Sequence, residues 1–96
     1  MYGLRTGGYE YATISANEDI LPAIKAQEDA IFTTVKVTEL RDISIVPTSG
    51  DCHIKINGGT PIFCKQDIGY SNDISVNTSF VVVENGTTFY MAYNYN

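Results

Sequence analysis

His53 and the two cysteines are the residues whose side chains most often carry catalysis or bind transition metals. A Cys-His dyad requires the thiol and the imidazole to lie within hydrogen-bond reach. In a strand from Asp51 to Asn57, His53 points to the face opposite Cys52, so the dyad is not expected. Zinc needs three or four clustered soft ligands, and Cys52, His53 and Cys64 have no recognised ligand spacing. We therefore expect an ordinary, half-exposed strand histidine and no metal.

Paired carboxylates, the groups that glycosidases use, occur only at adjacent positions. Glu18-Asp19 and Glu28-Asp29 lie in predicted loops or helix ends, where a solvated surface is expected. Asp67 and Asp73 flank Gly69 but lack the alternating oxygen ligands and terminal glutamate of a calcium loop. The sequence thus predicts no catalytic residue, no metal site and no bound cofactor, and a protein that is not an enzyme.

Residues 51–57 and 60–64 predict a first β-hairpin. The Asn57-Gly58-Gly59 segment fits a three-residue loop, a type I turn with a bulge and Gly59 in the left-handed region. In that register Cys52 lies opposite Cys64 on an apolar face. Facing cysteines are close enough for a disulfide if the protein meets an oxidising medium. Free, buried thiols are favoured for a chain without a signal peptide, and the disulfide is the alternative.

A second hairpin is predicted from residues 79–84 and 87–93. Between them lies Asn85-Gly86, the strongest short-range signal for a type I′ turn. The expected register pairs Val82 with Phe89 and Phe80 with Met91. Both faces of this pair are apolar, so we expect it to lie between two buried layers.

The first half of the chain predicts further strands and one short helix. Residues 9–15 alternate in the manner of a short edge strand. Residues 19–27 predict at most one short helix, which Pro22 limits to about two turns. β-Branched residues alternate over 30–40 and predict a strand. A break or bulge at Arg41-Asp42 separates it from another strand that ends at the next proline.

These elements add up to about six to eight short strands at intervals of roughly 10 residues. One of them is expected near residues 74–76, within a polar connection. We therefore predict an all-β fold, an antiparallel β-sandwich or small barrel. Residues 1–8 are rich in glycine and predict an N-terminal arm, and residues 9–96 predict a single β-sandwich domain.

Charge and composition argue against several classes of partner. The net charge is −5 at pH 7 and the six Lys and Arg residues are scattered, which argues against nucleic acid or an anionic membrane. The chain start has no secretory signal, and no apolar run approaches about 18 residues, so a soluble protein made in a cytoplasm is expected. Charged residues make up only 18%. A surface rich in Thr, Ser, Asn and Tyr suits a protein that packs against neighbours.

Tyrosines gather near both ends of the chain. We expect Tyr2, Leu4, Tyr9 and Tyr11 to contact a partner, because tyrosine combines an apolar ring with a polar tip. An arm and open strand edges gain stability by packing against copies of the same chain or against a shell. Aligned tyrosines also suit stacking on sugar rings, so a carbohydrate- or receptor-binding β-sandwich that binds a glycan is the alternative.

Residues 32–96 resemble a group of small bacteriophage virion proteins that includes head decoration, head fibre and tail accessory components. The resemblance lies in three segments: Ile54-Lys55-Ile56-Asn57-Gly58, Ser79-Phe80-Val81-Val82-Val83-Glu84 and Phe89-Tyr90-Met91-Ala92-Tyr93. It implies a non-enzymatic structural protein of a phage particle, present in many copies and assembled as a symmetric homo-oligomer. Its partners would be copies of itself and other virion proteins of the capsid or tail. Its location would be the virion, after synthesis in the bacterial cytoplasm.

Overall fold

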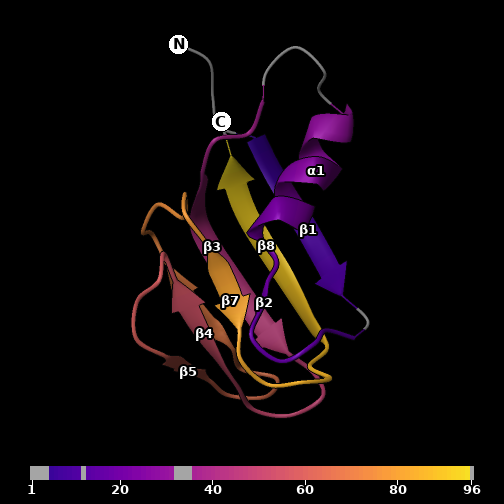
Figure 1. Cartoon of the computed structure of the whole chain (residues 1–96), viewed down its shortest axis with the longest axis vertical. Coiled ribbons are helices and arrows are strands. Elements are labelled where there is room, and N and C mark those ends of the chain that lie inside the picture. Colours follow the sequence, from indigo (N-terminus) through magenta and orange to yellow (C-terminus); the bar gives the residue numbers. More distant parts are fainter. Residues whose placement is uncertain (1–4, 12, 32–35, 96) are drawn as a thin grey trace.

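Eight strands and one helix make up the described part of the chain in the computed structural model (Figure 1). The structure describes residues 5–11, 13–31 and 36–95. The strands are β1 (Arg5–Tyr11), β2 (Glu18–Asp19), β3 (Leu40–Pro47), β4 (Cys52–Ile56), β5 (Ile62–Cys64), β6 (Tyr70–Asn72), β7 (Phe80–Val82) and β8 (Phe89–Tyr95), and the helix is α1 (Leu21–Ile31). Among these residues, no helix has the length and apolar character needed to cross a bilayer.

The strands form two four-stranded antiparallel sheets. One sheet has the order β1-β8-β3-β6, and the other has the order β2-β7-β4-β5. We call them the β8 sheet and the β4 sheet. The predicted all-β sandwich is confirmed, and the barrel alternative is wrong because the described strands form two separate sheets.

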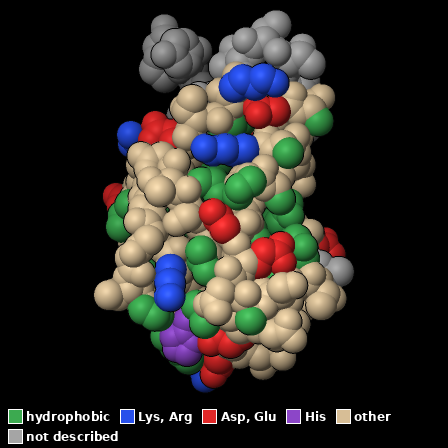
Figure 2. Space-filling model, viewed as in Figure 1, with side chains coloured by type: hydrophobic (Ala, Val, Ile, Leu, Met, Phe, Trp, Pro, Cys, Tyr) green, Lys and Arg blue, Asp and Glu red, His purple; other side chains and the backbone are tan. Residues whose placement is uncertain are grey.

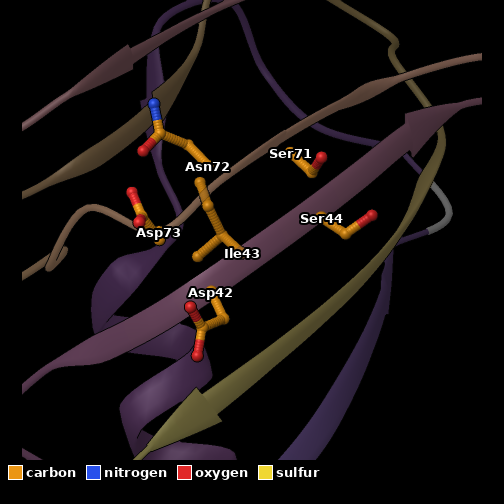
Figure 3. A pocket seen from close by; sticks show the side chains of 6 residues that line it. All are labelled: Asp42, Ile43, Ser44, Ser71, Asn72 and Asp73. Atoms are coloured by element: carbon orange, nitrogen blue, oxygen red, sulfur yellow. The ribbon is translucent and has the colours of Figure 1, made fainter.

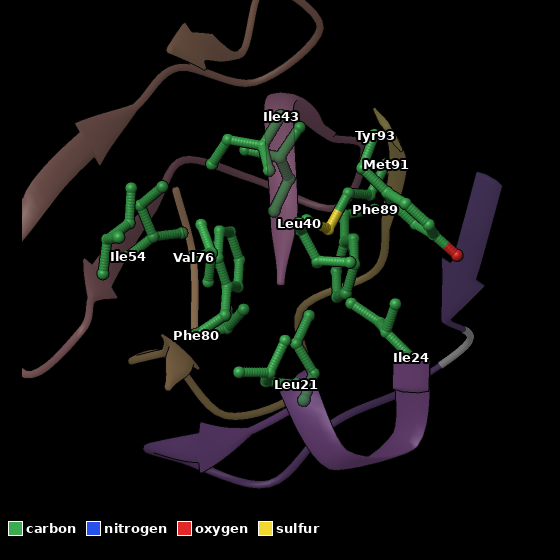
Figure 4. Packing of buried hydrophobic residues seen from close by; sticks show 14 of the residues in the cluster. Leu21, Ile24, Leu40, Ile43, Ile54, Val76, Phe80, Phe89, Met91 and Tyr93 are labelled. Carbon is green, nitrogen blue, oxygen red and sulfur yellow. The ribbon is translucent and has the colours of Figure 1, made fainter. Parts of the chain in front are cut away.

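The core lies between the inward faces of the two sheets and is completed by α1 (Figure 4). Strict alternation along β8 puts Phe89, Met91 and Tyr93 inside. Phe80 of the opposite sheet and Ile24 of α1 point toward the same centre. Alternation therefore decides which face of each strand is buried, as expected for sheets with one solvated side.

The first hairpin has the predicted register but a different turn. Cys52 pairs with Cys64. Asn57 and Gly58 both have positive φ, 53° and 75°, and the Gly59 N–H donates to the Ile56 carbonyl at 2.9 Å. This is a two-residue type I′ turn followed by an extra residue, so the expected left-handed Gly59 is wrong. Asn57 and Gly58 both tolerate the left-handed conformation, so the two-residue type I′ turn is preferred to the predicted three-residue loop.

The predicted second hairpin is wrong, because its two strands belong to different sheets. β7 pairs with β2 and β4, whereas β8 pairs with β1 and β3. The segment around Gly86 crosses between the layers, where the Gly86 N–H donates to the Ile14 carbonyl at 2.7 Å. Phe80 and Met91 therefore face one another across the core instead of lying side by side. In the sandwich β7 and β8 lie in different sheets, and each of them buries one face against the core between the sheets.

The helix is longer than predicted and replaces the start of a predicted strand. α1 has 11 residues, with Pro22 in its first turn, where a missing N–H costs nothing. Asp19 Oδ1 accepts the Leu21 N–H at 3.1 Å and so satisfies one free donor of that turn. At the other end, Asp29 Oδ1 accepts the Val37 N–H at 2.8 Å.

The strand expected over 30–40 is therefore wrong at residues 30–31 and 36–39, and only Leu40 lies in a strand, at the start of β3. Its first residues are helical, residues 36–39 are not in a strand, and residues 32–35 lie outside the described residues. The bulge is confirmed, since the β3–β8 register shifts between Arg41 and Ser44, and Asp42 has φ 51°. The short strand expected near 74–76 lies earlier, at β6. Val76 contributes only an isolated bridge to Leu40.

Candidate functional site

β1 is the longest open edge in the molecule as described. It has seven residues, against two in β2 and three each in β5 and β6, the other edge strands. The boundary expected between an arm and a domain at Gly8 falls inside this strand, because Arg5 already pairs with Tyr95. Residues 5–8, the described part of the predicted arm, therefore belong to the β8 sheet.

Hydrogen bonds show which backbone groups of β1 face away from β8. The Gly8 carbonyl accepts from Gln27 Nε2 of α1 at 2.8 Å, so it points to the open side. N–H and C=O of one residue point the same way in a strand, and the direction alternates along it. Thr6 and Glu10 therefore also present their backbone groups to the open edge, which can accept another strand.

Two of the four predicted partner contacts are partly used inside the molecule. Tyr9 and Tyr11 are half-buried and pack against the core. The Tyr11 ring stacks on Phe89 with centroids 6.2 Å apart, and its hydroxyl donates to Glu18 Oε2 at 3.0 Å. That hydrogen bond to Glu18 raises the pKa of Tyr11 above its ordinary value. Tyr2 and Leu4 lie outside the described residues.

A buried carboxylate holds α1 against β1. Glu28, expected to be solvated, is only 3% exposed, so this expectation is wrong. Its carboxylate accepts hydrogen bonds from the Tyr93 hydroxyl and from Gln27 Nε2. Gly7 makes room for this contact, because a Cβ there would lie 2.6 Å from Glu28 Oε2. Helix, edge strand and central strand are thus joined at one point beneath β1.

The Tyr93 hydroxyl is expected to make the free energy of unfolding depend on pH in the alkaline range. Burial, followed by the hydrogen bond to Glu28, raises the pKa of Tyr93 above its ordinary value. The folded chain therefore keeps this proton above about pH 10, where the unfolded chain loses it, so stability falls as pH rises further. We expect Tyr93→Phe to lower the free energy of unfolding by about 1–3 kcal/mol at pH 7 and to flatten the alkaline fall. Urea unfolding between pH 7 and 11 measures both.

Tyr90→Phe is the matched control, because Tyr90 is exposed and the same atom is removed. We expect its free energy of unfolding at pH 7 to stay within about 0.5 kcal/mol of the wild-type value. Wild-type and Tyr93→Phe curves that remain parallel up to pH 11 would contradict the role given to this hydroxyl.

An exposed tyrosine on the outer face of the β8 sheet borders an open hollow. Tyr90 is 55% exposed and pairs with Glu10 of β1 across the sheet. The hollow has a volume of about 280 Å³ and is lined by Glu10, Tyr11, Thr48, Thr88, Phe89 and Tyr90. The hydroxyl oxygens of Thr48 and Thr88 lie 2.7 Å apart. The lining of this hollow thus includes aromatic rings, a carboxylate and two hydroxyls.

A second open hollow lies beside β3 and β6, at the bulge (Figure 3). It also has a volume of about 280 Å³ and is lined by Asp42, Ile43, Ser44, Ser71, Asn72 and Asp73. Asp42 Oδ2 already accepts a hydrogen bond from Asn94 Nδ2 at 2.9 Å. No group of three or more metal-binding side chains is found within residues 5–11, 13–31 and 36–95.

His53 lies on the outer face of β4, opposite in direction to the cysteines, as predicted. Its Nδ1 lies 2.6 Å from Glu84 Oε2, and its backbone N–H donates to the other Glu84 oxygen at 2.7 Å. Its ring meets Phe63 edge-on, with centroids 5.6 Å apart.

Charged side chains of both signs are interspersed with neutral surface on the face seen in Figure 2. This pattern favours no partner of high charge.

The two cysteines face each other in the β4 sheet, Cys52 on β4 and Cys64 on β5. Cys52 and Cys64 are directly paired, buried and free. A hydrogen bond to Cys64, together with burial, raises the pKa of Cys52. The same hydrogen bond lowers the pKa of Cys64, against the opposing effect of burial.

Comparison of the chain with protein-family models, with curated proteins and with solved structures found no match.

Sequence reasoning missed Glu28 and Tyr90. Glu28 is one of two adjacent acids, and nothing local separates a buried carboxylate from a solvated one. The signal lay in Gly7, which removes a side chain from the strand face over which Glu28 docks. The predicted second hairpin puts Tyr90 in a strand buried on both faces. Its exposure follows from the assignment of β7 and β8 to different sheets.

Proposed function

We propose that this chain is a non-enzymatic structural protein that self-associates through the open edge of β1 and docks on other proteins of a particle. The particle is a bacteriophage virion, in which the chain serves as a capsid decoration, fibre or tail accessory component. The observation that carries the self-association is the seven-residue edge strand with Thr6 and Glu10 directed outward. Support for the particle comes from the sequence resemblance over residues 32–96.

Pairing of β1 with β1 of a second copy extends the β8 sheet across a dimer. An antiparallel pair of identical strands has twofold symmetry, so both copies use the same groups. The Gly8 carbonyl of this edge accepts hydrogen bonds from Gln27 Nε2 at 2.8 Å and from the Tyr93 hydroxyl at 3.5 Å. The flexible Gln27 side chain can turn away. Backbone hydrogen bonds supply affinity in this mode of association, and the neighbouring side chains supply specificity.

The outer surface offers further contacts for docking. Phe63 and Ile68 are 53% and 70% exposed, and Ile74 is 48% exposed. Single exposed apolar residues are common on monomers. These three residues can therefore add apolar contact area to an interface, but they do not show which surface docks on the particle. A many-copy particle protein needs both a self-contact and a contact to the shell. We assign the first to β1.

Light scattering over a range of concentrations tests the self-contact. Thr6→Pro removes a backbone N–H that faces away from β8, so it blocks the open edge while sparing the pairing inside the chain. We expect the wild-type mass to rise with concentration to a defined oligomer and the proline variant to remain a monomer at the same concentrations. A shift of the dissociation constant by about tenfold or more corresponds to roughly 1.4 kcal/mol or more.

Thr6→Ala is the matched control. It removes the same hydroxyl, which donates to Asn94 Oδ1 at 2.8 Å, but keeps the N–H. It is expected to associate as the wild type does. A wild-type protein that stays monomeric at every concentration contradicts self-association, and a proline variant with the wild-type mass contradicts the use of β1.

A carbohydrate- or receptor-binding module is the second candidate, and the hollow beside Tyr90 favours it. Glycan-binding surfaces combine an exposed aromatic ring with hydrogen-bonding side chains. We expect Tyr90→Ala to weaken binding of any glycan found on a neutral-glycan array by about tenfold. Phe63→Ala is the control, because it removes a comparably exposed ring from the other sheet. Equal loss in both variants, or no glycan bound by the wild type, argues against this candidate.

A further inference from the structure

The two cysteines sit at a pairing position whose geometry permits a covalent bond. The Val83 N–H donates to the His53 carbonyl at 3.0 Å, so His53 points its backbone groups toward β7. By alternation, Cys52 points its own toward β5 and forms a hydrogen-bonded pair with Cys64. Cα atoms of such a pair lie about 5.5 Å apart, inside the range of roughly 4.4–6.8 Å that disulfides span. The Cα separation therefore permits the bond, and the two Cβ atoms, up to about 5.5 Å apart in such a pair, must approach to about 4 Å to form it.

One of the two thiols can reach solvent by a small opening of the fold. β5 has three residues, lies at the edge of the β4 sheet and carries the exposed Phe63. β4 lies between β7 and β5 and is held on both sides. Short edge strands open at lower free energy than central ones. Cys64 therefore becomes accessible first, while Cys52 stays in place beside it.

We propose that Cys52 and Cys64 are joined by a disulfide bond when the protein meets a small-molecule disulfide such as oxidised glutathione. The Cys64 thiolate attacks one sulfur of the oxidant, and half of the oxidant leaves as a thiolate, which takes up the proton that Cys64 lost. Cys52 then loses its proton and attacks Sγ of Cys64, and the second half leaves as a thiol. Two protein thiols are oxidised by two electrons, and one small disulfide is reduced to two thiols.

The bond fixes the edge strand β5 to β4 and closes a loop over the first hairpin. Closing a loop of this length restricts the unfolded chain, and in a protein of this size the expected rise in Tm is about 10 °C. The site does not depend on the assembly proposed above, because it lies on the β4 sheet and β1 belongs to the other sheet.

Mass spectrometry of the whole protein tests the proposal. Reduced, folded protein is incubated with oxidised glutathione, quenched in acid, unfolded and alkylated with iodoacetamide. We expect a monomeric chain that has lost the mass of two hydrogen atoms and carries no alkyl group, with a higher Tm that dithiothreitol reverses. Two alkylated cysteines after prolonged incubation, or a wild-type chain that keeps one glutathione, would overturn the proposal.

Two variants test the order of attack. Cys52→Ala leaves Cys64 without a partner, so it is expected to accumulate a stable glutathione adduct. Cys64→Ala is expected to form the adduct at least about tenfold more slowly, because Cys52 lies on a strand paired on both sides. Thermal unfolding of the reduced variants checks that both fold. The reverse order of rates would overturn the assignment of Cys64 as the attacking thiol, and the wild-type mass decides the bond itself.

Discussion

Replacing Gly7 with valine is expected to lower the free energy of unfolding by about 3 kcal/mol. A Cβ at this position would lie 2.6 Å from Glu28 Oε2 and 2.7 Å from Tyr93 Cε1, both closer than side-chain atoms approach in practice. Glu28 and Tyr93 are buried and bonded to each other, so neither can move aside without breaking the contact between α1 and the β8 sheet. Urea unfolding at one fixed protein concentration measures the loss.

Gly8→Val is the matched control, one residue away on the same strand. A Cβ there would meet only the Met91 carbonyl, at an ordinary 3.6 Å. This position is exposed, and valine favours strands, so the expected change is within about 0.5 kcal/mol. Equal destabilisation by the two substitutions would show that the loss comes from the glycine backbone and not from the docking of Glu28.

Gly69→Ala is expected to lower the free energy of unfolding by about 3 kcal/mol, for a different reason. Gly69 has φ 80°, and a Cβ would lie 2.1 Å from the Ile45 carbonyl oxygen, a backbone atom of β3. Relief of this overlap must push β6 away from β3 next to the Ile45–Tyr70 pair. Thermal unfolding measures the loss, and faster amide exchange in β6 locates it.

Gly86→Ala separates the cost of the backbone angle from the cost of the overlap. Gly86 has φ 77°, nearly the same, but no atom lies within 4 Å of the position that its Cβ would occupy. The expected loss is therefore only the cost of the left-handed conformation, about 1 kcal/mol. Losses of the same size at both glycines would contradict the explanation by overlap.

The parts of the fold that follow from local chemistry were predictable from the sequence. Alternation and a three-residue loop over Asn57-Gly58-Gly59 were enough to pair Cys52 with Cys64 and to place His53 on the opposite face, although the conformation of the loop was predicted wrongly. The break at Arg41-Asp42 was predictable as well, because these two residues disfavour a strand and interrupt a run of β-branched residues. In each case the residues that decide the structure lie within about a dozen positions of one another.

The parts that depend on distant partners were not predictable. Asn85-Gly86 carries a strong hairpin signal, yet the strands on either side find better partners in β4 and in β3. Ile31 is β-branched and belongs to the predicted strand, but it lies in α1, because the helix packs on the core. The burial of Glu28 required Gly7, Gln27 and Tyr93 together. Neighbouring acids give no sign of it.

Amide exchange along β1 as a function of protein concentration tests self-association through this edge most directly. The N–H groups of Thr6, Gly8 and Glu10 face the open side, whereas those of Gly7 and Tyr9 face β8 and serve as internal controls. If β1 joins two copies, exchange at the three outward amides slows as concentration rises, and exchange at the two inward amides changes little. If the outward amides exchange equally fast when light scattering shows an oligomer, the copies associate through another surface.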